Sequence, residues 1–129
     1  MKIGCENNYL EINPKLNDGF TYFHLIAKIT ENQGTFTGEN NRVVYGGGKE
    51  ELKNLHKFES YEVNDVHIAL SENCYLKLLR ESRGSISINF QISIIIAGEQ
   101  TSMKGSVGID GEHAQTSIAK LAKYFYTCL

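Results

Sequence analysis

The stretch that decides the fold is Ser85-Ile86-Ser87-Ile88-Asn89-Phe90-Gln91-Ile92-Ser93-Ile94-Ile95-Ile96-Ala97. Its even-numbered side chains, from Ile86 to Ile96, are apolar, and its odd-numbered side chains are polar as far as Ser93. Successive side chains of a strand point to opposite faces of a sheet. The alternation therefore predicts a long strand with one face on the core and the other in water.

Other segments rich in β-branched and aromatic residues surround this strand, and turn signals separate them. Those before it are Tyr9–Ile12, Phe20–Thr30, Thr35–Tyr45, Val66–Leu70 and Cys74–Arg80. After it, a short turn at Gly98–Gln100 leads into a weaker alternation, which predicts a hairpin. Because the turns are too short for the dozen residues of a parallel crossover, we expect antiparallel neighbours. The apolar parity of Tyr61–Leu70 switches at Asn64-Asp65, which predicts a break there.

Two segments change to helical spacing. Lys49–Phe58 places Leu52, Leu55 and Phe58 on one stripe, and Gly46–Gly48 supply the turn before it. The C-terminal segment has apolar residues at a helical period, namely Ala114, Ile118, Leu121, Ala122, Phe125 and Leu129. Asp110 is the expected N-cap of this second helix.

Together these segments predict an α+β fold. We expect a single antiparallel sheet of about six to seven strands, a short helix after the third strand, and a C-terminal helix packed on one sheet face. The chain has 129 residues, 41% of them hydrophobic, and a single proline. We therefore expect one domain over residues 1–129. The central packing prediction is that the Ile86–Ile96 face lies buried under the Ala114–Leu129 helix.

Charge and cysteine usage narrow the possible partners. The formal net charge is −2, and lysines and arginines are spread along the chain, so we expect no nucleic-acid binding. No stretch approaches the length of a membrane-spanning helix, so we expect no membrane partner. The widely spaced Cys5, Cys74 and Cys128 lack a CxxC pair, which favours free thiols in a reducing compartment and a cytoplasmic location.

No motif indicates catalysis. Gly46–Lys49 is followed by two glutamates rather than by the pattern of a phosphate-binding loop, so it is interpreted as a turn and helix start. The isolated histidines lack the spacing of a metal site; they are His24, His56, His67 and His113. We therefore predict that the protein is not an enzyme and holds no metal and no cofactor.

Two sets of residues are candidates for binding a protein partner, although both also suit an ordinary solvated surface. The first is a loose acidic group that could form a rim for a basic partner, namely Glu59, Glu62, Asp65 and Glu72. The second is the polar face of the long strand, which an open sheet would present as a flat platform. Its candidate residues are Ser87, Asn89 and Gln91.

Leu52–Phe125 resembles the small bacterial immunity proteins of the WapI type, which are partners of polymorphic contact-dependent toxins. The resemblance rests on a helix with spaced leucines, a strand and hairpin, an Arg83-Gly84 turn before the long strand, and a final strand followed by Asp110 and a closing helix. It implies a non-catalytic protein that neutralises a cognate toxin domain by direct binding. It implies no residue-level site.

Two further hypotheses stay open. The first is a small-ligand-binding or enzymatic domain with a pocket between the sheet and the C-terminal helix. The aromatic side chains expected to line that pocket are Tyr22, Phe23, Phe36 and Tyr45, and His24 or His67 beside a carboxylate would favour it. The second is self-association through an exposed edge strand, so both a monomer and a homodimer are considered.

Overall fold

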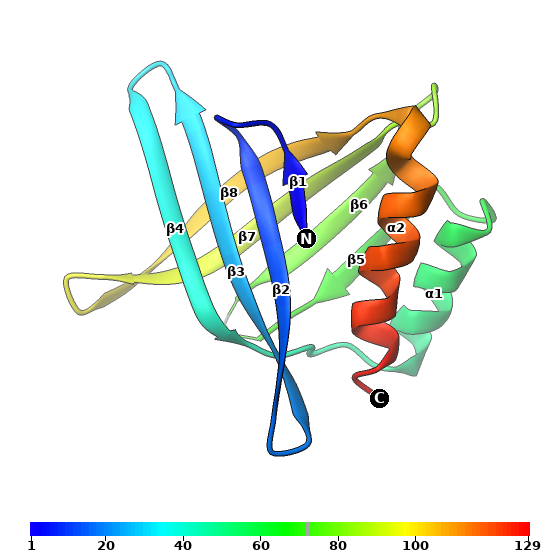
Figure 1. Cartoon of the computed structure of the whole chain (residues 1–129), viewed down its shortest axis with the longest axis horizontal. Coiled ribbons are helices and arrows are strands. Elements are labelled where there is room, and N and C mark those ends of the chain that lie inside the picture. The colour runs from blue at the N-terminus through cyan, green and yellow to red at the C-terminus, as the bar shows by residue number, and fades with distance from the viewer. Residues whose placement is uncertain (72) are drawn as a thin grey trace.

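Figure 1 shows the computed structural model, which describes residues 1–71 and 73–129. Its elements are β1 (Lys2–Gly4), β2 (Tyr9–Asn17), β3 (Phe20–Glu31), β4 (Gly34–Val43), α1 (Lys49–Glu59), β5 (Asp65–Ala69), β6 (Tyr75–Arg80), β7 (Ile86–Ile96), β8 (Glu99–Ile109) and α2 (Gly111–Tyr126). In the described residues the strands form two antiparallel sheets of four, in the orders β1-β2-β3-β4 and β5-β6-β7-β8. The α+β class predicted from the sequence is confirmed.

The prediction of a single sheet of six to seven strands is wrong. The chain leaves the first sheet after β4, forms α1, and then starts a second sheet. An isolated antiparallel bridge between Tyr45 and Leu70 lies beside this passage, and the Asn40 side chain of β4 donates a hydrogen bond of 2.8 Å to the Ser93 carbonyl of β7. The helix follows the fourth strand rather than the third because β1, which is too short to show an alternation, pairs with β2.

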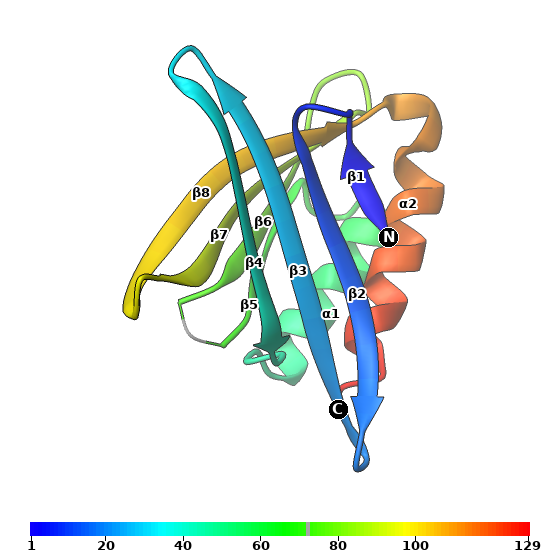
Figure 2. The same cartoon turned by 60° about the vertical axis from the view of Figure 1, so that its left-hand side comes forward.

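The two sheets and α2 share one hydrophobic core. The strands of the sheets cross steeply, and the β1–β4 sheet lies over one face of β5–β8 beside α2 (Figures 1 and 2). Ile86, Ile88, Phe90 and Ile92 are at most 1% exposed. The burial predicted for this face is confirmed over those residues, but the β1–β4 sheet covers part of it, and Ile96 near the hairpin tip is 59% exposed.

Two glycines allow this close approach of the sheets. A Cβ at Gly38 would come within 2.8 Å of the Met103 sulfur and 3.2 Å of Ile94. A Cβ at Gly105 would meet Ile29 and the ring of Phe90. Glycine inside a strand often marks a site where another part of the protein comes near. Here, side chains of the opposite sheet occupy the space beside each glycine: Met103 and Ile94 lie beside Gly38, and Ile29 lies beside Gly105.

The break predicted near Asn64 is confirmed. Tyr61 has φ 66°, and β5 begins only at Asp65, which places the following apolar residues on the core side. The Arg80 guanidinium lies between the rings of Phe58 and Tyr61, at 4.5 and 4.2 Å from their centroids. Its Nη2 also donates a hydrogen bond of 2.6 Å to the Phe58 carbonyl, so Arg80 fixes this connection.

The glycine run before α1 is a helix-entry turn, as predicted. A Cβ at Gly47 would meet the Tyr45 hydroxyl and would lie 2.5 Å from the Glu51 carboxylate. That carboxylate accepts a hydrogen bond of 2.7 Å from the backbone N–H of Ala69. Gly47 therefore leaves room for a contact that ties the first turn of α1 to the end of β5.

The turn of the β7–β8 hairpin contains a conformationally costly alanine. Ala97 and Gly98 both have positive φ, 53° and 81°, as a type I′ turn requires. A left-handed conformation costs most L-residues about 1–2 kcal/mol, and asparagine tolerates it better. We expect Ala97→Asn to raise the free energy of unfolding by about 0.5–1 kcal/mol in urea denaturation. Gly98→Ala puts a Cβ at the other residue with positive φ and should lower the free energy of unfolding. If Gly98→Ala were more stable than Ala97→Asn, this explanation of the turn would be wrong.

Candidate functional site

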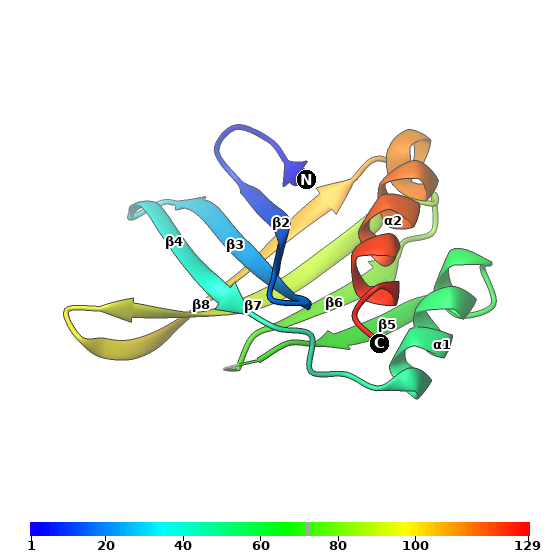
Figure 3. The same cartoon turned by 60° about the horizontal axis from the view of Figure 1, so that its bottom comes forward.

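One face of the β5–β8 sheet is not covered by any element in the described part of the chain (Figure 3). The strand register places its side chains in three rows that cross the sheet. We call these residues the outer sheet face: Asp65, Leu79, Ser87 and Gly108; His67, Lys77, Asn89 and Ser106; Ala69, Tyr75, Gln91 and Lys104. All twelve are half-buried or exposed. The surface is rigid because backbone hydrogen bonds hold every strand in it.

The structure brings four of the seven predicted partner-binding residues onto the outer sheet face. Asp65 lies in the same row as Ser87, and Asn89 and Gln91 occupy the next two rows of β7. Two of these side chains already have protein partners. Ser87 donates to a Glu81 carboxylate oxygen at 3.2 Å, and Gln91 donates to the Asn73 carbonyl at 2.7 Å.

The remaining acidic candidates do not join this face. Glu59 accepts a hydrogen bond of 2.6 Å from the Tyr126 hydroxyl, and only 18% of its side chain is exposed. Glu62 is exposed at the turn after α1 and accepts a hydrogen bond of 2.9 Å from Ser60. Glu72 lies outside the described residues. The Glu59 carboxylate thus joins α1 to α2, which leaves it little freedom to meet a partner.

Eight of the twelve residues of the outer sheet face were missing from the predicted binding set, and four of these lie close together on β5 and β6. His67 and Tyr75 stack with ring centroids 5.6 Å apart and an interplanar angle of 29°. Lys77 and Leu79 lie beside them on β6, and Leu79 is 41% exposed. The alternation within Tyr75–Arg80 carried the signal: Leu76 and Leu78 face the core, so the odd-numbered side chains must face outward.

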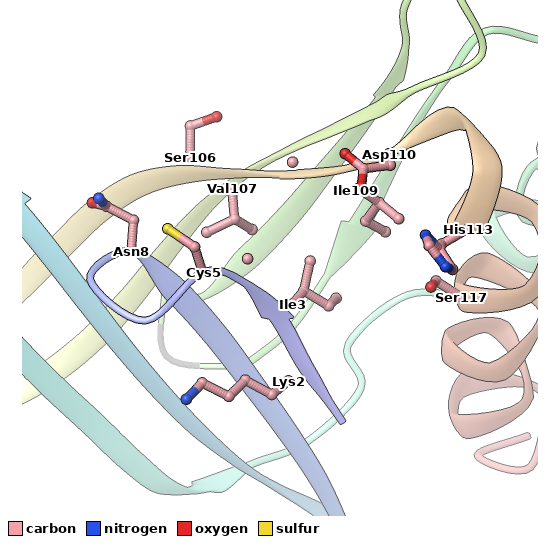
Figure 4. Close-up of a pocket in the computed structure, with 12 residues that line it drawn as sticks. Lys2, Ile3, Cys5, Asn8, Ser106, Val107, Ile109, Asp110, His113 and Ser117 are labelled. Atoms are coloured by element: carbon pink, nitrogen blue, oxygen red, sulfur yellow. The ribbon is translucent and has the colours of Figure 1, made fainter.

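A slot of about 480 Å³ lies between β1, β8 and the first turns of α2 (Figure 4). His113 and Ser117 line it from α2, and Cys5 lines it from the opposite side (Figure 4).

The aromatic residues expected to line a ligand pocket lie in different places. Phe23 is buried against Phe125, with centroids 5.2 Å apart, and the Tyr45 ring also packs against Phe125, with centroids 5.7 Å apart. Phe36 is 51% exposed near the β3–β4 hairpin, and Tyr22 is half-buried. These four side chains therefore do not share one cavity.

The other candidate chemical groups are dispersed over the structure. His24 lies 2.8 Å from the Glu39 carboxylate on an exposed part of the first sheet. Within residues 1–71 and 73–129, no group of three or more His, Cys, Asp or Glu residues could hold a metal ion. Cys5, Cys74 and Cys128 form no disulfide bond with one another, and the Cys74 sulfur accepts a hydrogen bond of 3.2 Å from the backbone N–H of Ser93.

No helix in the described part of the chain is long and apolar enough to cross a membrane. Comparisons with protein-family models, with curated proteins and with solved structures give no match to this chain.

Proposed function

We propose that the protein is a non-catalytic binding module that neutralises a bacterial toxin domain by direct contact through the outer sheet face. The observation that carries the proposal is an open, rigid sheet surface on which Tyr75, Leu79 and Asn89 lie within three adjacent rows. Aromatic residues are enriched in protein interfaces, and well-packed anchors at the centre contribute most of the binding energy. The resemblance of Leu52–Phe125 to WapI-type immunity proteins is what suggests a toxin as the partner.

The surface suits a protein better than a small molecule. The surface is an open sheet face rather than an enclosed cavity, and its His67 and Tyr75 rings already stack on each other. An ordered surface loses little conformational entropy on binding, which favours affinity. Its lysines and one aspartate give a mixed charge, so the outer sheet face itself does not demand a strongly basic partner.

The test is co-expression with the C-terminal domain encoded by the gene immediately upstream. We expect the protein to form a 1:1 complex with that domain and to restore growth. Lys77→Glu/Asn89→Glu changes two cross-strand neighbours of the outer sheet face and should weaken binding at least tenfold. Lys28→Glu/Thr37→Glu changes a matched pair of cross-strand neighbours on the other sheet and should leave binding unchanged.

Two results would count against the proposal. If the unmodified protein neither binds the domain nor restores growth, toxin neutralisation is wrong. If it binds but both double variants bind equally well, the contact lies elsewhere on the protein. Circular dichroism of each variant checks that the charge reversals leave the fold intact.

A further inference from the structure

A second surface, separate from the outer sheet face, lies where α1 and α2 meet. It is a shallow groove of about 580 Å³. The residues that line it are Lys49, Leu52, Lys53, His56, Lys57, Glu62 and Tyr126. The three lysines recur every four residues along α1 and therefore share one side of that helix. At a rise of 1.5 Å per residue, they form a stripe about 12 Å long.

Most carboxylates around this lysine stripe have other partners. Glu62, which also lines the groove, accepts a hydrogen bond of 2.9 Å from the Ser60 hydroxyl. Glu51 is directed toward the backbone N–H of Ala69, at 2.7 Å, and Glu59 toward the Tyr126 hydroxyl, at 2.6 Å. Glu50 pairs with Lys53 at 3.3 Å, but both side chains are more than two-thirds exposed, so water screens this pair. In the described residues, no carboxylate lies within 4 Å of the ammonium groups of Lys49 or Lys57.

The floor of the groove is apolar. Leu52 and Tyr126 line the groove, and both are half-buried. Burial and the hydrogen bond to Glu59 raise the pKa of the Tyr126 hydroxyl, which therefore stays protonated and remains bound to Glu59. The polar end of Tyr126 is thus satisfied inside the protein, and its ring contributes carbon atoms to the groove.

The position of Lys49 is not explained by the stability of α1. It is the first residue of the helix, where the macrodipole favours negative side chains and disfavours a lysine. Glu50 and Glu51, which follow it, have the favourable sign. A lysine at this end does extend the positive stripe by one full turn.

We propose that the groove between α1 and α2 binds an acidic amphipathic segment of a partner protein. Carboxylates of that segment pair with Lys49, Lys53 and Lys57, and its apolar side chains cover Leu52 and Tyr126. Charge complementarity and an apolar floor favour this occupant over a nucleic acid, whose phosphates would use the lysines and leave the floor unfilled. A membrane is disfavoured because the apolar residues of the groove, Leu52 and Tyr126, are half-buried and offer little exposed apolar surface to insert into lipid. The proposal is independent of the toxin contact on the outer sheet face.

The probe is a synthetic sixteen-residue peptide with glutamates on one helical face and leucines on the other. Fluorescence anisotropy should show binding that weakens as the salt concentration rises, because the contacts are partly electrostatic. Lys49→Glu/Lys53→Glu/Lys57→Glu should weaken it at least tenfold, and the Gln triple variant should have a smaller effect. Lys15→Glu/Lys28→Glu/Arg42→Glu makes the same change in net charge on the first sheet, away from the groove and from the outer sheet face, and should stay within twofold of the unmodified protein.

Three comparisons can overturn the proposal. A scrambled peptide of the same composition should bind at least fivefold more weakly, and equal binding would mean that only charge matters. Vesicles containing 30% phosphatidylserine and a sixteen-base-pair DNA duplex are the competing ligands. If either binds more tightly than the peptide, and the lysine-stripe variant abolishes that binding, the partner is not an acidic peptide. Absence of peptide binding would refute the proposal directly.

Discussion

Replacing Phe125 with alanine is expected to lower the free energy of unfolding by about 3–5 kcal/mol, because the substitution leaves a cavity in the core. Phe125 is 1% exposed, and its ring packs against Phe23 of β3 and against Tyr45. It therefore holds α2 against the first sheet and against the segment that follows β4. Loss of this side chain removes contacts with two separate parts of the chain.

Urea denaturation followed by circular dichroism measures this effect. Lys123→Ala is the matched control, because Lys123 is exposed on the same helix and should change stability by less than about 0.5 kcal/mol. A loss of stability below about 1 kcal/mol for Phe125→Ala would mean that neighbouring side chains fill the cavity at little cost. That result would contradict the claim that Phe125 holds α2 against the first sheet.

The second large effect is expected at Gly105. A Cβ at this position would meet the end of Ile29 and lie 2.7 Å from the ring of Phe90, which is 1% exposed. Overpacking of a filled core typically costs about 1–3 kcal/mol, so Gly105→Ala should lower the free energy of unfolding by that amount.

Gly108 on the same strand provides the control for this substitution. The nearest atom to a Cβ at Gly108 is the Ile86 carbonyl oxygen, at 3.8 Å, so Gly108→Ala meets only ordinary contacts. It should be neutral or slightly stabilising, because alanine also restricts the unfolded chain. Equal losses for the two variants would show that strand propensity, rather than packing between the sheets, decides the effect.

Local patterns predicted the elements of this fold well, because each pattern reports on a single element. The alternation of Ile86–Ile96 identified β7, and the spacing in Lys49–Phe58 identified α1. The parity switch near Asn64 identified the start of β5, because a one-residue change of phase reverses the faces of a strand.

The division into two sheets was missed because it depends on long-range pairing. Alternation shows that β4 and β5 are strands, but it does not show whether they are neighbours in one sheet. One signal was present: Gly38 and Gly105 interrupt two strands and mark the places where the sheets approach. With both glycines on inward-facing positions, the sequence could have suggested face-to-face packing.

The candidate site was predicted in part for the same reason. Ser87, Asn89 and Gln91 came from the long alternation of β7, and the structure places them on an uncovered face. The neighbours on β6, including Tyr75, become visible only when the register of β6 and β7 is known. The inward direction of the Glu59 carboxylate depends on Tyr126 of another helix, which no local pattern reveals.

The central claim is that the outer sheet face binds a protein partner, and backbone amide NMR of the complex tests it most directly. The measurement compares amide shifts of the free protein with those in its complex with the upstream-encoded domain. We expect the largest changes at Lys77, Asn89 and their row neighbours on β5–β8, and little change on the exposed surface of β1–β4. Changes confined to the slot beside His113, or no change on β6 and β7, would contradict the claim.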